Sequence, residues 1–227
     1  MNAKKTTHPD RFGMSLFEVL IVISVIGILM AITAPAFITL GPAKQGAILD
    51  LKVFIEDAQH VAIRDQRDVY IAFADEEAPD GAQWRRYAYF CPDESSVDTS
   101  LLTRPLRQVS RWQNLPNGVV FASGEHFDAG AGSFKTLLDA SIRREFEFFD
   151  AKGVTQNSRL SFLMFNAKGG IAIPPIVEAD SLHLGIADGF VDSDGQRIFQ
   201  GVNNEGLPRT ECLGINFYTG KARIITR

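Results

Sequence analysis

Hydrophobic and polar residues divide this chain into three stretches. Residues 1–13 form a short polar stretch, whereas residues 19–40 contain no charged side chain. A helix over 19–40 spans about 33 Å, close to the thickness of the hydrocarbon core of a bilayer. The remaining residues mix apolar runs with charged residues and turn signals. The pattern therefore predicts one long apolar helix followed by a folded head.

The mixed part opens with a second helical pattern. We expect Gly41-Pro42 to interrupt the chain, after which apolar residues recur every three or four positions over Lys44–Arg67. These residues are Ala47, Ile48, Leu51, Ile55, Ala58 and Ala62. The spacing predicts an amphipathic helix whose apolar stripe needs a partner surface.

Short segments rich in β-branched and aromatic residues predict that surface, because turn signals separate them. The expected strands are Val69–Ala74, Trp84–Cys91, Arg107–Gln113, Val119–Ala122, Glu145–Phe149, Leu160–Phe165, Gly170–Ile173, Ser181–Ile186, Leu213–Tyr218 and Ala222–Thr226. Thr136–Arg144 is ambiguous and is interpreted as a short helix. A helix packed on an antiparallel sheet gives an α+β fold.

The apolar run is more consistent with a retained anchor than with a secretory signal. Its basic flank predicts a cytoplasmic N-terminus and an exported head. Secretory signals usually have a shorter apolar core, and Pro35 with its apolar continuation also argues against cleavage there. A plain anchor, however, leaves Glu18 unexplained, because a carboxylate near the bilayer core costs roughly a few kcal/mol.

The residues around Glu18 resemble the class III signal of type IV pilins and type II secretion pseudopilins. The stretch is Gly13-Met14-Ser15-Leu16-Phe17-Glu18, followed by VLIVISVIGILMAITAP. It has a basic leader, a glycine before the cleavage point, an acid five residues into the mature chain and Pro35 at the family's usual helix kink. Met14 departs from the family, which prefers phenylalanine there.

The resemblance implies four segments. Residues 1–13 are a prepilin leader, 14–40 a transmembrane and later filament-core helix, 41–68 the amphipathic helix and 69–227 a β-rich head. A prepilin peptidase would cut between Gly13 and Met14 and N-methylate Met14.

In the assembled filament, the resemblance assigns Glu18 to neutralise the α-amine of a neighbouring subunit and so to set the axial register. Such a desolvated ion pair adds little net stability, but removing one partner is costly. Pro35 lacks an amide hydrogen and would kink the helix.

The function implied is that of a structural subunit rather than an enzyme, and the large head favours a minor subunit. Its partners would be the prepilin peptidase, other pilin or pseudopilin subunits and an inner-membrane assembly platform. The protein would cross the inner membrane once, with its head in the periplasm, and later enter a periplasmic or cell-surface filament. The alternative is a membrane-tethered periplasmic enzyme or binding protein with a prepilin-like anchor.

The C-terminal end carries a finer resemblance. The hairpin ECLGINFYTGKARIITR resembles minor pilins of the FimT type and, more closely, the D-type protein of the Verru_Chthon cassette. Its FYTGKA also echoes FDAKG at Phe149–Gly153 and FNAKG at Phe165–Gly169. We interpret the echo as repeated hairpin chemistry in which the glycine takes a positive φ.

Composition and motifs limit other functions. The formal net charge is −4 and no block of Lys or Arg is present, so nucleic acid is not an expected partner. No nucleotide-binding, zinc-protease or serine-hydrolase motif appears, so we expect no cofactor and no catalytic residues. His60 is expected at the surface, and His126 lacks a second histidine at ligand spacing.

Two further sets of residues leave alternatives open. Cys91 and Cys212 would form a disulfide in an oxidising compartment if the geometry allows, or remain two buried thiols. Asp188, Asp192 and Asp194 resemble part of a calcium loop, although they do not fit the EF-hand template, and a solvated acidic turn is the other interpretation.

Overall fold

The computed structural model describes residues 17, 19–26, 40–78, 83–95, 100, 102–126, 137–139, 143–149, 155–173, 181–203 and 206–225. The chain divides into two units, Met1–Thr39 and Leu40–Arg227, and each is described by itself. In the first unit, residues 19–26 are helical. The second unit is the head.

Helix α2 (Leu40–Arg64) is the predicted amphipathic helix. It begins earlier than expected, so Gly41 and Pro42 lie within its first turn rather than interrupting it. Proline fits there because the first backbone amides of a helix have no intrahelical partner. The helix ends before Gln66, which adopts a φ of 50° and whose side chain donates to the Ile63 carbonyl at 2.6 Å.

Strands provide the partner surface for α2. They are β1 (Val69–Phe73), β2 (Arg86–Pro92), β3 (Leu106–Gln108), β4 (Gln113–Asn114), β5 (Val119–Ala122), β6 (Arg143–Phe149), β7 (Thr155–Phe165), β8 (Ile171–Ile173), β9 (Ser181–Val191), β10 (Arg197–Phe199), β11 (Thr210–Asn216) and β12 (Ala222–Ile225). Two 3₁₀ turns, η1 (Gly124–His126) and η3 (Leu137–Asp139), complete the described elements.

The described strands form two antiparallel sheets. The first has the order β3-β2-β1-β7-β6, with β4 also paired to β2 and β8 to β7. The second has the order β10-β9-β11-β12, with β5 paired to β9. This arrangement confirms the predicted α+β class.

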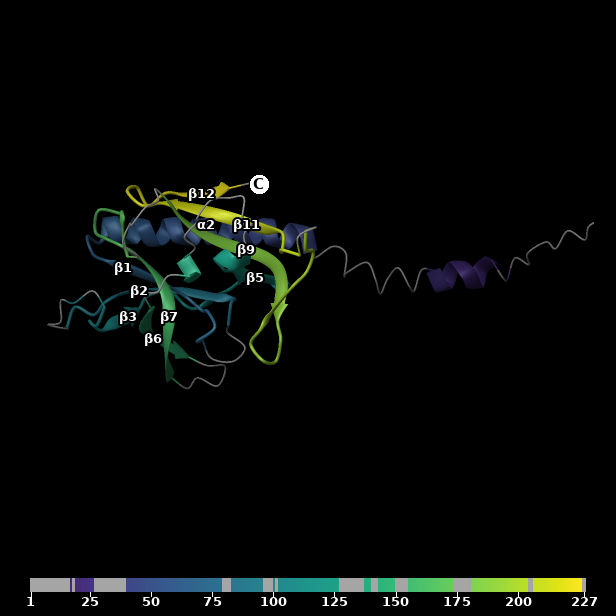
Figure 1. Cartoon of the computed structure of the whole chain (residues 1–227), viewed down its shortest axis with the longest axis horizontal. Coiled ribbons are helices and arrows are strands. Elements are labelled where there is room, and N and C mark those ends of the chain that lie inside the picture. The colour runs from purple at the N-terminus through teal and green to yellow at the C-terminus, as the bar shows by residue number, and fades with distance from the viewer. Residues whose placement is uncertain are drawn as a thin grey trace, which may run out of the picture. The chain divides into compact units, whose positions relative to one another are not determined.

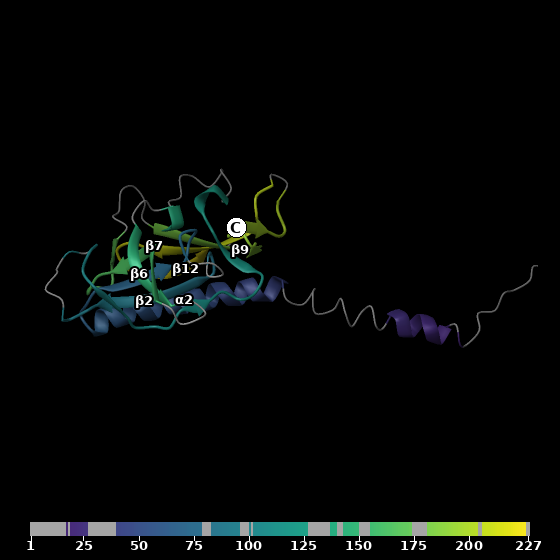
Figure 2. The same ribbon diagram turned by 90° about the horizontal axis from the view of Figure 1, so that it is seen from below.

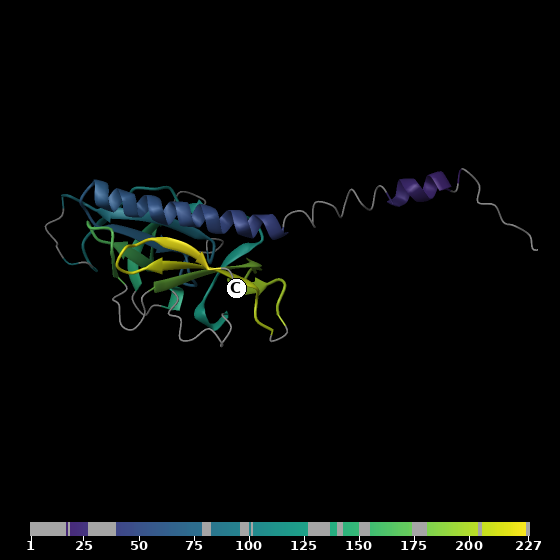
Figure 3. The same cartoon turned by 90° about the horizontal axis from the view of Figure 1, so that it is seen from above.

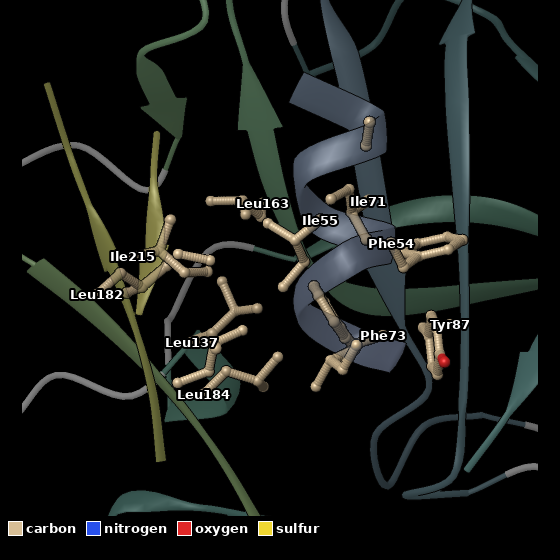
Figure 4. Close-up of a cluster of buried hydrophobic side chains, with 14 of the residues drawn as sticks. Phe54, Ile55, Ile71, Phe73, Tyr87, Leu137, Leu163, Leu182, Leu184 and Ile215 are labelled. Atoms are coloured by element: carbon tan, nitrogen blue, oxygen red, sulfur yellow. The ribbon is translucent and has the colours of Figure 1, made fainter. Parts of the chain in front are cut away.

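Helix α2 packs against both sheets. In Figure 4, Phe54 and Tyr87 lie on one side of the helix, and Leu182 and Ile215 lie on the other. The rings of Phe54 and Tyr87 meet edge to face with centroids 4.7 Å apart. In Figure 3 the helix runs beside β11 and β12, and Figure 2 shows it beside β2. One helix therefore closes the apolar faces of two sheets.

The first sheet also buries a second cluster. It contains aromatic and aliphatic side chains from β1, β2, β6, β7 and β8: Tyr70, Phe90, Phe146, Leu160, Phe162, Met164 and Ile173. The guanidinium groups of Arg104 and Arg144 stack near the Tyr70 ring, 5.2 and 4.9 Å from its centroid. This sheet is therefore covered by apolar packing on both faces.

Most predicted strands are confirmed, with shifted ends. The segment predicted at Arg107–Gln113 is two short strands, β3 and β4, which pair with different parts of β2. Figure 1 shows β3 beside β2. Strand β10 was not predicted. The helix predicted over Thr136–Arg144 is wrong, because Leu137–Asp139 is a 3₁₀ turn and Arg143 begins β6, where it pairs with Ser161.

Two copies of the repeated turn lie side by side. In the turns of residues 166–170 and 216–220, the side-chain oxygens of Asn166 and Asn216 accept hydrogen bonds from backbone amides further along each turn. The amide of Ile171 donates to the carbonyl of Phe217 at 2.8 Å. Gln59 of α2 reaches both turns, donating to the carbonyls of Gly169, at 2.8 Å, and Thr219. The first copy, at 149–153, lies almost wholly outside the described residues.

A substitution at Gly220 tests the contact between the two turns and Gln59. Its φ is +64°, and an added Cβ would collide with the Gly169 carbonyl and the Gln59 side chain. We expect Gly220→Ala to lower the free energy of unfolding by about 1–3 kcal/mol, measured by urea denaturation. Gly46→Ala is the control, because an added Cβ there meets nothing within 4 Å and alanine favours a helix interior by up to about 1 kcal/mol. Equal changes in the free energy of unfolding for the two substitutions would contradict the conclusion that the contact of the two turns with Gln59 requires glycine at position 220.

Candidate functional site

The helical segment of the first unit is apolar on every side. Its described large apolar side chains, from Phe17 to Ile26, are 40–70% exposed. Its polar Ser24 donates its hydroxyl to the Leu20 carbonyl at 2.8 Å, within the helix itself. A helix that is hydrophobic all round requires apolar surroundings.

The predicted processing and assembly residues lie outside the described residues. These are Gly13, Met14, Glu18 and Pro35, and their roles stay predictions. Within the part of the chain that is described, no helix has both the length and the apolar character needed to cross a membrane.

In the head, α2 presents a face that neither sheet covers. Leu49, Val53 and Ile63 are 53%, 63% and 42% exposed on it, although they belong to the helix that supplies the core. The buried stripe, with Leu51 and Ile55 fully buried, fixes which residues face outward. The exposed face is thus a consequence of how the helix packs.

A groove of about 460 Å³ runs along one flank of α2. Helix α2, β2 and the residues around β4 line it with Ala47, Asp50, Val53, Phe54, Asp57, Tyr87, Gln113, Asn114 and Pro116. Asp50 and Asp57 are both exposed, and neither forms an ion pair within the described part of the chain. Asp57 accepts a hydrogen bond from the Tyr89 hydroxyl at 3.3 Å.

The groove is therefore aromatic in its wall and negative at its rim. Burial, and then the charge of Asp50, raises the pKa of Tyr87 to about 12. Burial, followed by the charge of Asp57, also raises the pKa of Tyr89. Both phenols stay neutral at physiological pH, so the negative charge of the groove comes from the two aspartates.

Lys44 fixes the first turns of α2 to the second sheet. Its ammonium lies 3.0 Å from the Asp188 carboxylate of β9 and donates to the Arg209 carbonyl at 3.2 Å. The two side chains are 12% and 20% exposed, so the pair is mostly shielded from water. This contact places the start of the head relative to β9.

The structure separates the three aspartates of the possible calcium site. Asp188 pairs with Lys44, whereas Asp192 accepts the backbone amides of Asp194 and Gln196 at 2.9 and 2.8 Å and so closes the turn between β9 and β10. Among the described residues, no group of three or more His, Cys, Asp or Glu side chains is placed to hold a metal ion. Asp192 thus caps an acidic turn, and calcium binding stays a prediction.

Cys91 and Cys212 are both buried, and no disulfide joins them. Cys91 belongs to β2 of the first sheet, and Cys212 to β11 of the second. In the structure the two residues are therefore buried thiols held in different sheets. Burial also raises the pKa of the Cys91 thiol, which reduces its reactivity.

The three histidines in the described part of the chain, His60, His126 and His183, do not form a shared site. His60 is exposed on α2, as predicted. The Nδ1 atom of His126 lies 2.8 Å from the Ser123 hydroxyl, and its ring packs against Phe199. His183 is buried in β9, 3.4 Å from the Ser181 hydroxyl.

Sequence reasoning missed three polar contacts. Lys44 and Gln59 hold α2, and the fully buried Asp75 accepts hydrogen bonds from the Ser161 amide and hydroxyl at 3.1 and 2.7 Å. Burial raises the pKa of Asp75 in spite of Arg143, whose Nε lies 3.3 Å away. The contact of Gln59 could have been predicted from the sequence, because Gln59 is next to Ala58 of the buried stripe. A polar side chain at the border of a buried stripe indicates a hydrogen-bond partner in the core.

Comparison with known proteins identifies the N-terminal segment. The family model described as the prokaryotic N-terminal methylation motif matches residues 9–34. This confirms the predicted prepilin-type N-terminus, which includes the positions of Gly13, Met14 and Glu18. No curated protein matches the chain.

One solved structure resembles the chain. It is the type IV minor pilin FimU of Pseudomonas aeruginosa, with 14% sequence identity, 81% of this chain and 88% of that chain covered, and a TM-score of 0.35.

The ion pair between Lys44 and Asp188 leads to a prediction about the stability of the head. Lys44→Ala leaves the Asp188 carboxylate partly buried without its cation, and we expect the free energy of unfolding to fall by about 1–3 kcal/mol. Lys52→Ala is the matched control, because Lys52 pairs with Glu56 on the same helix with both side chains about one-third exposed. That change should cost less than about 0.5 kcal/mol by the same urea titration. A loss for Lys44→Ala no larger than for Lys52→Ala would disprove the anchoring role.

Proposed function

We propose that this chain, which carries a prokaryotic N-terminal methylation motif, is a structural, minor subunit of a type IV pilus-like or type II secretion pseudopilus filament. The motif at residues 9–34 is the observation that carries the proposal. The motif includes most of the apolar run at residues 19–40, and the run is followed in the sequence by a head whose first helix is half-buried.

The proposed maturation begins in the inner membrane. A prepilin peptidase cleaves between Gly13 and Met14 on the cytoplasmic side and methylates the new N-terminus. The apolar segment holds the subunit in the membrane with its head in the periplasm. The subunit then joins other pilin or pseudopilin subunits with the help of an inner-membrane assembly platform.

Physical features of the described residues support this role. The helix at residues 19–26 exposes apolar side chains in all directions, which suits both lipid and a bundle of like helices. The outer face of α2 adds Leu49, Val53 and Ile63 as further apolar contacts for neighbouring subunits. We propose a structural rather than a catalytic role for the head.

Processing is tested on protein from the native host. We expect mass spectrometry to show a mature chain that begins at Met14 and carries one methyl group on its α-amine. Gly13→Val should leave the leader attached, because the peptidase must accommodate the residue before the cut, whereas Gly46→Ala in the head should be processed normally. An intact Met1, or a cut after residue 40, in the wild-type protein would refute the proposal.

Assembly is tested at Glu18. We expect Glu18→Ala to be cleaved and methylated at wild-type levels but to lose most incorporation into sheared or cross-linked filaments, because the neighbour's α-amine is left unpaired. Ser24→Ala is the control, since the Ser24 hydroxyl is already bonded within its own helix. Wild-type incorporation of Glu18→Ala would instead favour a plain anchor for a periplasmic enzyme or binding protein.

A further inference from the structure

The groove beside α2 has features of a docking site for a cation on an apolar stem. Its carboxylates, Asp50 and Asp57, are seven residues apart on the helix, which separates them by about 10 Å along the axis. Between them lie the exposed Val53 and the aromatic wall of Phe54 and Tyr87. Lysine and arginine bury their methylene stems on such surfaces and place their charge at the rim or over a ring.

The opposite flank of α2 carries the complementary charge. Lys221 directly precedes β12 and Arg223 lies within it, and both are exposed. Within the described residues neither forms an ion pair, so these two charges are available, as are those of Asp50 and Asp57. Two residues apart along an extended strand, they lie about 7 Å from each other, and their long side chains can reach the more widely spaced aspartates.

The core fixes these flanks on opposite sides of the helix. Figure 4 shows Phe54 and Tyr87 on one side and Ile215 on the other, and Ile215 belongs to β11, which pairs with β12. A molecule therefore cannot place its own β12 in its own groove. A second copy can do so, and its own groove then remains open for a third.

We propose that the groove receives the Lys221–Arg223 edge of a second copy of this chain. The contact is heterologous, since different surfaces meet, and such contacts generate open helical arrays unless the rotation closes a ring. The inference rests on the proposed filament role, for which it names a lateral contact. A minor subunit is one present in few copies, and two of those copies can still be neighbours.

The test uses charge exchange in the full mature chain in detergent. Sedimentation equilibrium measures self-association of the wild type, of Asp57→Lys, of Arg223→Glu and of the protein that carries both changes. We expect each single reversal to weaken self-association at least about tenfold and the double exchange to restore it to within about threefold. Raised salt should weaken the wild-type contact, because the charges lie at the surface.

Controls separate this contact from general charge effects. Glu56→Lys matches the charge change of Asp57→Lys but lies on α2 outside the groove. Lys168→Glu matches the charge change of Arg223→Glu on an exposed turn. Both should stay within about threefold of the wild type. Association through the apolar segment is common to all these proteins, so it does not alter the comparison. If circular dichroism shows that Asp57→Lys is unfolded, Asp50→Lys with Lys221→Glu replaces the pair.

Two results would overturn the inference: wild-type self-association that the single reversals do not change, or a double exchange no stronger than the weaker single reversal. Neither affects the proposed function, which depends on the methylated Met14. Conversely, an unprocessed N-terminus with a working charge exchange would remove the filament setting and leave the contact between heads in place.

Discussion

The fold of the head depends on one constraint, which is that a single helix must cover two sheets. Leu51 and Ile55 are fully buried, and the same cluster contains Ile71 of the first sheet and Ile215 of the second. Without α2, both sheets would expose apolar faces to water, and this burial is the main favourable term in folding. Because the stripe is committed to the core, the identity of the outward face and of both flanks follows from it.

Apolar burial sets the rotation of the helix about its axis only to within the width of the stripe, because hydrophobic contact is not directional. Hydrogen bonds and ion pairs are directional, and the head places them toward both ends of α2. Lys44 binds Asp188 and the Arg209 carbonyl near the start, and Gln59 binds the paired turns near the end. Within the range that the stripe allows, these contacts hold Asp50 and Asp57 in place, and so the groove also depends on residues that do not line it.

Elements that depend on a local pattern of residues could be predicted from the sequence. Elements that form only by pairing with distant segments could not. Val119–Ala122 was predicted with its correct ends because an apolar run lies between a glycine turn and a polar segment. Strand β10 has three residues and forms through pairing across its hairpin, as Ile198 does with Phe190. The groove was not predictable either, because Tyr87 and Asn114 reach α2 from segments whose pairing no periodicity encodes.

The N-terminal segment poses a different physical problem from the head. Helix α2 buries its apolar stripe within the head. The helix at residues 19–26 has apolar side chains exposed on all sides, so its apolar surroundings must come from lipid or from other molecules. Lipid and neighbouring helices meet that requirement about equally, so apolar burial gives little preference between them. A carboxylate changes this balance, since it is costly in lipid and compensated beside an amine. The attraction between opposite charges strengthens as the dielectric constant falls. Apolar surroundings that would penalise a lone Glu18 would therefore also strengthen the pairing proposed for it. The preference for an assembled state would then reside in one acid, and the apolar residues around it would serve both states.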